Sequence, residues 1–203
     1  MAERARVTGV VLAAGEGRRM GLPKALVETA DGEPWVRRAV GVLRDGGCDE
    51  VLVVVGAAAG RVRAVVEDVR PVPALVEAHD WGAGMGASLR AGLQHLVDRP
   101  AGDAALVMLV DLPDVGPQVV RRVRGHVDAA EDRRSTLARA TYDGRPGHPV
   151  LIGRDHWSAM AATLSGDEGG RRYLAEHDAV GIECGDLATG RDQDTPTGSP
   201  GPE

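Results

Sequence analysis

Short apolar runs alternate along the chain with longer segments in which apolar and polar positions recur at helical spacing. Four runs, rich in Val, Leu and Ala, have the length of buried strands: residues 7–12, 51–55, 74–77 and 104–110. Helical patterns separate them. Such alternation is typical of a mainly parallel sheet covered by helices. The pattern therefore predicts an α/β fold.

The first helix is expected to begin near Pro34 and to end at Gly46-Gly47, because proline favours a first helical turn and glycine a helix end. The turn-rich segment Asp143-Gly-Arg-Pro-Gly147 predicts an antiparallel pair between residues 136–142 and 148–152. A short strand is expected at 180–184. The remaining predicted helices cover residues 61–69, 87–97, 119–130, 156–164 and 170–177.

The chain has 203 residues and a formal net charge of -6, with acidic and basic residues interspersed. This size predicts a single domain over residues 1–194. The mixed charge argues against a nucleic-acid partner, which would require a basic face. Because no apolar run could span a bilayer and the N-terminus lacks a signal-peptide core, we expect a cytoplasmic protein without a membrane partner.

The two cysteines and the C-terminal segment carry no predicted chemistry. Cys48 and Cys184 are far apart and lack metal-ligand spacing, so they are interpreted as reduced packing residues. Residues 195–203 consist largely of Pro, Gly, Ser and Thr without apolar side chains. We expect this tail to be disordered.

The candidate chemistry is concentrated directly after the first predicted strand. Glycines there let the backbone turn tightly and present its N–H groups, while cations can neutralise a polyphosphate. A strand that ends in such a loop predicts a nucleotide triphosphate site in an α/β protein. The glycines and cations of this segment are Gly15, Gly17, Gly21, Arg18, Arg19 and Lys24.

Two common nucleotide loops do not match this segment. The dinucleotide fingerprint requires a small residue where Met20 stands, and Arg19 inside the loop also disfavours it. A P-loop requires Ser or Thr after its lysine, but Ala25 follows Lys24. A plain surface loop is the structural alternative.

Two other segments are expected at the same edge of the sheet. Asp111 follows the most apolar strand, where its carboxylate suits Mg²⁺; a helix cap is the alternative role. The glycines of Gly84-Met-Gly-Ala-Ser88 precede an amphipathic helix, so their N–H groups and the Ser88 hydroxyl could bind a base or ribose. The alternative is a simple Ser/Gly helix cap.

The full string Leu12-Ala-Ala-Gly-x-Gly-x-Arg-Met-Gly-x-Pro-Lys24 resembles the signature of nucleotidyltransferases. Within that superfamily it is similar to the MobA-like NTP transferases, above all to the molybdenum cofactor cytidylyltransferase branch. Further matching segments span nearly the whole chain: Gly84–Gly92, Val110-Asp-Leu-Pro113, Gly147-His-Pro-Val-Leu151, Gly166–Arg171 and Asp192-Gln-Asp-Thr-Pro196. The resemblance implies a Rossmann-like three-layer α/β/α nucleotidyltransferase fold.

The resemblance also implies transfer of CMP from CTP to the phosphate of molybdopterin, a phosphorylated pterin acceptor, with Mg²⁺. Asp111 and Asp194 would bind the metal, and Asp192 is the second choice for the ligand assigned to Asp194. The alternative for the late acidic motif is a solvated acidic tail. His148 and Asp167 would line the acceptor side, although a lone histidine is equally often structural. Arg19, Lys24 and Asp111 would be catalytic. The nucleotide-binding residues would be Leu12, Ala13, Ala14, Gly15, Gly17, Arg18, Arg19, Lys24, Gly84, Gly86 and Ser88.

The implied reaction leaves alternatives open. In the family, Leu-Ala-Ala-Gly accompanies CTP and Leu-Ala-Gly-Gly accompanies GTP, so Ala13-Ala14 favours CTP. Thr197 follows Asp194-Thr-Pro196 where the family has an acidic residue, which affects the second metal contact and the acceptor. Transfer to another small phosphate ester, a dinucleotide-binding module, and an NTP-binding chaperone that delivers cofactor to a molybdenum enzyme apoprotein remain as rivals.

Overall fold

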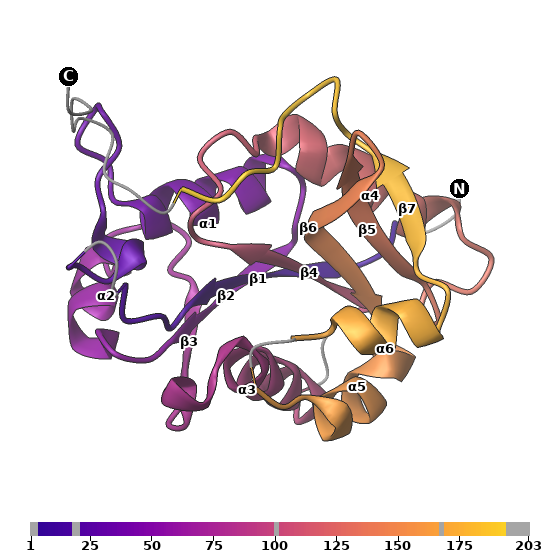
Figure 1. The fold of residues 1–203 in the computed structure, drawn as a ribbon, viewed down its shortest axis with the longest axis horizontal. Helices are drawn as coiled ribbons and strands as arrows, with labels where there is room; N and C mark the ends of the chain where they lie inside the picture. Colours follow the sequence, from indigo (N-terminus) through magenta and orange to yellow (C-terminus); the bar gives the residue numbers. More distant parts are fainter. Residues whose placement is uncertain (1–3, 18–20, 100–101, 167–168, 194–203) are drawn as a thin grey trace, which may run out of the picture.

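A computed structural model describes residues 4–17, 21–99, 102–166 and 169–193. Figure 1 shows a twisted central sheet between two groups of helices. The seven strands follow the order β3-β2-β1-β4-β6-β5-β7, and β6 alone runs antiparallel to its neighbours. Their bounds are β1 Val7–Ala13, β2 Glu50–Val55, β3 Ala74–Glu77, β4 Ala104–Leu109, β5 Leu137–Tyr142, β6 Arg145–Gly153 and β7 Val180–Glu183.

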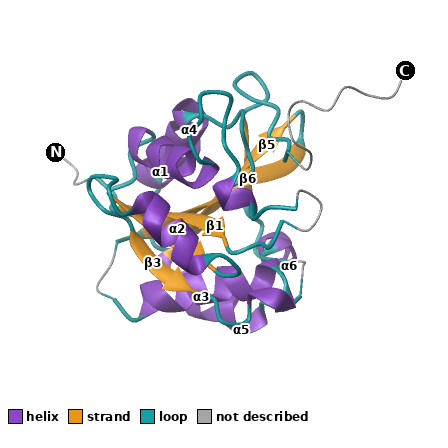
Figure 2. Ribbon diagram, turned by 90° about the vertical axis from the view of Figure 1, so that its left-hand side faces the viewer, coloured by secondary structure: helices purple, strands orange, loops and turns teal. Residues whose placement is uncertain are grey.

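Helices cover both faces of the sheet (Figure 2). One layer packs against one apolar cluster and consists of α1 (Trp35–Asp45), α2 (Ala59–Val66) and α4 (Pro117–Ala129). The opposite layer consists of α3 (Met85–Val97), α5 (Trp157–Thr163) and α6 (Arg171–Glu176). This arrangement confirms the predicted three-layer α/β/α fold with a mainly parallel sheet.

Strand β1 lies in the centre of the sheet, and this position explains why its sequence lacks a regular alternation of polar and apolar residues. All seven of its residues are buried, because alternate side chains enter the apolar cluster on either side. Val7 and Val11 face α1, whereas Val10 and Leu12 face α3. Burial on both faces removes the polar alternation of a half-exposed strand and leaves a continuous apolar run.

The predicted elements all occur, with shifted ends. The helix expected at 61–69 is α2, which begins at Ala59 and ends at Val66. The antiparallel pair has a tighter turn than predicted, since β6 already begins at Arg145. Asp143 and Gly144 both have positive φ, 51° and 74°, as a two-residue hairpin turn requires.

Short 3-10 turns connect several elements, and two of them border the site described below: η1 (Lys24–Leu26) and η2 (Trp81–Ala83). In the described part of the chain, no helix has the length and apolar character needed to cross a membrane. The tail expected to be disordered, residues 195–203, lies outside the described residues. Cys48 and Cys184 form no disulfide with each other and are both buried, as predicted.

Candidate functional site

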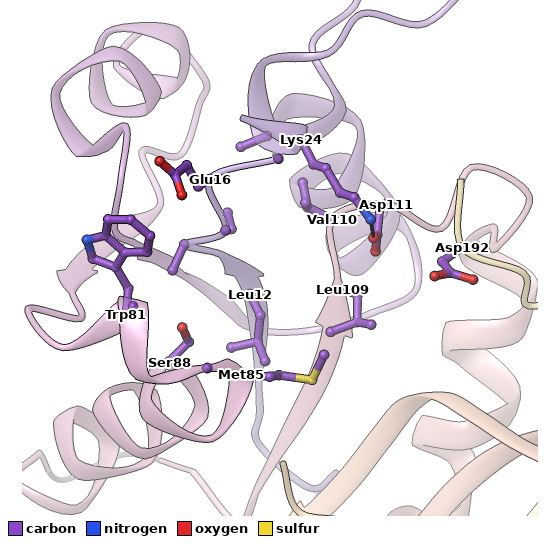
Figure 3. A pocket seen from close by; sticks show the side chains of 17 residues that line it. Leu12, Glu16, Lys24, Trp81, Met85, Ser88, Leu109, Val110, Asp111 and Asp192 are labelled. Atoms are coloured by element: carbon purple, nitrogen blue, oxygen red, sulfur yellow. Dashed lines mark hydrogen bonds and ion pairs between the residues drawn. The ribbon is translucent and has the colours of Figure 1, made fainter. Parts of the chain in front are cut away.

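A cleft of about 570 Å³ opens where β1 and β4 end. These strands are parallel neighbours, with Leu12 beside Leu109, so the loops that follow them meet at one edge of the sheet. Figure 3 shows the cleft between these loops and the start of α3. Its lining includes most of the predicted nucleotide-binding residues: Leu12, Ala13, Ala14, Gly15, Gly17, Lys24, Gly84 and Ser88, together with Asp111.

The loop after β1 folds back on itself at Gly17. Its φ is +67°, and a Cβ at this position would lie 2.0 Å from the Leu22 carbonyl oxygen. Any other residue would therefore clash with the returning backbone as well as strain its own. This turn brings the end of the loop, where η1 begins at Lys24, back toward the carboxyl end of β4.

Lys24 and Asp111 meet inside the cleft. The Lys24 Nζ donates a hydrogen bond to Asp111 Oδ2 at 2.6 Å, across 87 residues of sequence. Both side chains are largely buried, with 22% and 11% of their surfaces exposed. A charge-assisted bond at this distance, shielded from water, holds the ammonium group and the carboxylate in fixed positions. The cleft therefore presents one cation and one anion at a single point.

Lys24 is the single lysine in the sequence, in which the other 23 basic residues are arginines. A compact ammonium group differs from a planar guanidinium in reach and in the number of partners it can orient. The use of lysine at this one position is a sequence feature that the spacing of the loop residues does not reveal. It indicates that the contact to Asp111 suits a point charge.

Asp192 lines the cleft as well, which has Glu16, Asp111 and Asp192 as its carboxylate residues among those described. The backbone N–H of Gln193 donates to the Asp111 carbonyl oxygen at 3.0 Å, which brings this late segment onto the end of β4. Asp192 thus lies on the Asp111 side of the cleft (Figure 3). Within the described ranges, no group of three or more His, Cys, Asp or Glu residues gathers to hold a metal.

The donor set of Asp111 and Asp192 fits Mg²⁺. Mg²⁺ prefers hard oxygen ligands such as carboxylates, and it commonly takes few protein ligands beside substrate phosphates and water. The predicted metal ligand Asp194 lies outside the described residues, as do the loop cations Arg18 and Arg19 and the acceptor-side Asp167. Their assignments stay predictions.

The start of α3 differs in part from the sequence prediction. Gly84, with φ 111°, is the N-cap residue, so Ser88 lies within the first turns of the helix and is not the cap. Ser88 lines the cleft, which leaves its hydroxyl facing the site. Gly86 does not line it, and its N–H already donates to the Gly166 carbonyl oxygen at 2.9 Å. Gly86 therefore contacts the 164–166 loop, and its nucleotide-binding role stays a prediction.

Two large side chains outside the predicted binding residues also border the cleft. Trp81 of η2 lies across the cleft from Asp111, and Met85 lies at the base (Figure 3). Both belong to the segment around Gly84. The sequence feature that could have drawn attention to Trp81 is its position just before the glycines. The indole can offer a flat apolar surface to a ligand ring.

A second, smaller cavity of about 260 Å³ adjoins the cleft and shares Leu12, Met85, Leu109 and Asp192 with it. His148 on β6 lines this cavity, and its contact with an acceptor stays a prediction. Burial, and then the nearby Arg139 guanidinium, lower the pKa of His148 from 6.5 to about 4. The imidazole is therefore neutral near pH 7 and can accept a hydrogen bond.

The lowered pKa of His148 predicts a loss of stability on acidification. Between pH 6.5 and about 4 the unfolded chain takes up a proton that the folded chain does not, so the folded state is favoured above this window and loses stability within it. His148→Gln, which cannot titrate, should lose less. Thermal midpoints of both proteins across this window test this; parallel pH profiles would contradict it.

Comparisons with known proteins identify relatives over most of the chain. The family described as the MobA-like NTP transferase domain matches residues 9–180. The nicotine blue oxidoreductase of Paenarthrobacter nicotinovorans is 39% identical, with 93% of this chain and 92% of that protein covered. A protein named "Probable molybdenum cofactor guanylyltransferase" from Bacillus cytotoxicus is 29% identical, with 60% of this chain and 57% of that protein covered.

Solved structures show the same architecture. Rv0371c from Mycobacterium tuberculosis H37Rv superimposes with a TM-score of 0.74 at 28% identity, covering 95% of each chain. A structure of Rv0371c in complex with manganese has a TM-score of 0.68 at 28% identity, covering 88% of this chain and 87% of that one.

Proposed function

The chain belongs to the MobA-like NTP transferase family of the nucleotidyltransferase superfamily, and from this premise we propose that it transfers CMP from CTP to the phosphate of molybdopterin. The observation that carries the proposal is the Lys24–Asp111 pair, 2.6 Å apart beside a glycine loop in a cleft large enough for a nucleotide. A phosphorylated pterin in the adjoining cavity would bring its phosphate to the same point.

In this reaction an anionic phosphate oxygen of the acceptor attacks the α-phosphorus of CTP. The bond from that phosphorus to the bridging oxygen breaks, and pyrophosphate leaves. No covalent enzyme intermediate is needed, so the chain must align the two phosphates and stabilise the charge that moves between them. Lys24 would donate to the α-phosphoryl group, while Arg18, Arg19 and the loop N–H groups would hold the terminal phosphates.

Asp111, with Asp192 and Asp194 as further oxygen donors, would hold Mg²⁺. When bound, this ion would neutralise phosphate charge. The manganese in a structure of the related Rv0371c supports use of a divalent cation. Ser88 and the Ala13-Ala14 backbone would contact the base and ribose, and His148 and Asp167 would contact the acceptor. Delivery of the product to a molybdenum enzyme apoprotein is a compatible further step.

The nucleotide preference gives a direct test. Because Ala13-Ala14 precedes Gly15, CTP should bind at least about tenfold more tightly than GTP, or about 1.4 kcal/mol. Calorimetric titration with each nucleotide and Mg²⁺ measures this ratio, and ATP and UTP serve as controls. The relative named as a guanylyltransferase makes GTP the serious competitor. Equal or reversed affinity would reject the cytidylyl assignment but leave nucleotidyl transfer standing.

A redox reaction is the second candidate, because a relative covering nearly the whole chain is named nicotine blue oxidoreductase. Burial raises the pKa of the Cys48 thiol to about 12, and Cys184 is fully buried, so neither thiol suits electron exchange in the cleft. A nicotinamide dinucleotide would then be the donor to test. Oxidation of the reduced dinucleotide by nicotine blue, without pyrophosphate release from any nucleotide, would favour this candidate.

A further inference from the structure

The cavity beside the nucleotide cleft combines an apolar wall with basic side chains. Leu89, Val107 and Met160 contribute apolar surface, whereas Arg139 and Arg171 contribute guanidinium groups. Among the described lining residues the one carboxylate is Asp192, at the border with the nucleotide cleft. The described residues in the far part of the cavity are therefore apolar and cationic.

Arg139 lies on a strand where its neighbours are buried. On β5 its Cα pairs with Val150 of β6 on one side and with Gly181 of β7 on the other. Val150 lines the same cavity, and the glycine adds no side chain that could cover the arginine. The partly buried Arg139 side chain thus lies between β6 and β7 and faces the cavity.

The guanidinium of Arg139 has no protein partner in the described ranges. Its Nε is buried without a hydrogen bond, and no carboxylate of those ranges lies within ion-pair distance of it or of Arg171. Burial and the charge of Arg171 both lower the pKa of Arg139. A buried N–H donor without a partner is costly, and two unpaired cations beside each other add repulsion. A bound anion would accept a hydrogen bond from the buried N–H group and would reduce the repulsion between the two cations.

We propose that Arg139 and Arg171 form an anion-binding subsite of the acceptor cavity, which takes a ring-containing ligand bearing an acidic group. Charge-assisted hydrogen bonds from the two guanidinium groups would hold the acid, and the apolar wall would contact the ring. Neutral His148 could accept a hydrogen bond from a ring N–H of the same ligand. The subsite adjoins the proposed nucleotide cleft and does not depend on the identity of the transfer acceptor.

The acid held there is distinct from the phosphate that reacts. Arg139 pairs with Val150, and Val150 pairs with Val107, which precedes Asp111 by four residues on the neighbouring strand. The backbone of Arg139 is thus roughly 13 Å along the strands and roughly 10 Å across them from that of Asp111. An acid held there would therefore be a group other than the phosphate that reacts beside Asp111.

Direct binding without turnover tests the subsite. The probes are naphthalene-2-carboxylate and its neutral amide, which share the ring system and differ in charge. Calorimetric titration of the full chain should show the acid binding at least about tenfold more tightly than the amide, or about 1.4 kcal/mol. Arg139→Gln should bring this ratio close to one, and Arg171→Gln should lower it. Arg139→Lys, which keeps the charge, should retain part of it.

Arg172→Gln is the matched control, because Arg172 is exposed on the same helix and pairs with Glu176 at 3.8 Å. It should leave the ratio unchanged. Equal or undetectable binding of both probes to the parent protein, or an equal loss in the Arg172 variant, would overturn the subsite. Thermal melting and CTP titration of each variant report folding and the nucleotide cleft separately. Failure of CTP to bind would therefore reject the proposed function without affecting this result.

Discussion

Replacing Asp111 by Asn should lower the rate of nucleotidyl transfer by roughly 10²-fold or more, the scale for removal of one preorganised electrostatic contact. The amide keeps the shape of the side chain but removes the charge that Lys24 contacts at 2.6 Å and that a divalent cation would require. The fold should persist, because Gln193 donates to the Asp111 backbone carbonyl, which the substitution leaves in place. Pyrophosphate release from CTP measures the effect.

Asp98→Asn provides the control for this substitution. Asp98 is exposed and caps the C-terminal end of α3, the opposite end of the helix from the cleft. Its variant should retain the parent rate, and both variants should melt cooperatively. Near-normal pyrophosphate release by the Asp111 variant would remove the proposed metal and charge role from this residue.

Lys24→Ala should lower kcat far more than it raises KM for CTP. Charge on the α-phosphoryl group and its bridging oxygen changes in the transition state, whereas charge on the terminal phosphate changes little. A cation beside the α-phosphate therefore acts mainly on turnover. We expect a loss of about 10²-fold in kcat, and Lys24→Arg should recover only part of it, since a planar guanidinium cannot replace a point charge at this distance from Asp111.

Arg19→Ala is the contrasting variant. A cation at the terminal phosphates acts mainly on binding, so this substitution should raise KM at least as much as it lowers kcat. Steady-state kinetics with varied CTP separate the two effects for each variant. If both substitutions changed KM alone, the different roles given to the two cations would be wrong.

The sequence predicted a mainly parallel sheet covered by helices. It did not predict the order of the strands in the parallel half of that sheet. Continuous apolar runs such as β1 identify strands buried on both faces, and the helical spacing between them identifies the covering layers. Helix ends were less accurate, as at α2, because end residues depend on local packing more than on periodicity. The single-domain boundary at residue 194 stays a prediction.

The site was predictable where one segment carries the signal. The glycine loop and Asp111 could be located from their position after buried strands, and the cleft at this edge contains both. Contacts between distant segments could not be derived from local patterns. The Lys24–Asp111 bond depends on the fold-back at Gly17, and the approach of Asp192 depends on a backbone hydrogen bond to Asp111.

The surroundings of Arg139 also could not be derived from the local sequence pattern. Along β5 it is one polar position in a short strand, which sequence reasoning treats as a solvent-facing residue. The neighbouring strands enclose it because β5 lies between β6 and β7 and a helical layer covers that face. Its unpaired guanidinium becomes visible only once all three strands are in place.

Transfer of a nucleotidyl group by this cleft, beyond mere binding of a nucleotide, can be measured directly. The most direct measurement is pyrophosphate release from CTP and Mg²⁺ in the presence and absence of molybdopterin. Release should require the acceptor and yield one CMP-bearing product for each pyrophosphate. Tight binding of Mg-CTP without pyrophosphate release in the presence of any phosphorylated acceptor would contradict transfer and would favour a nucleotide-binding chaperone.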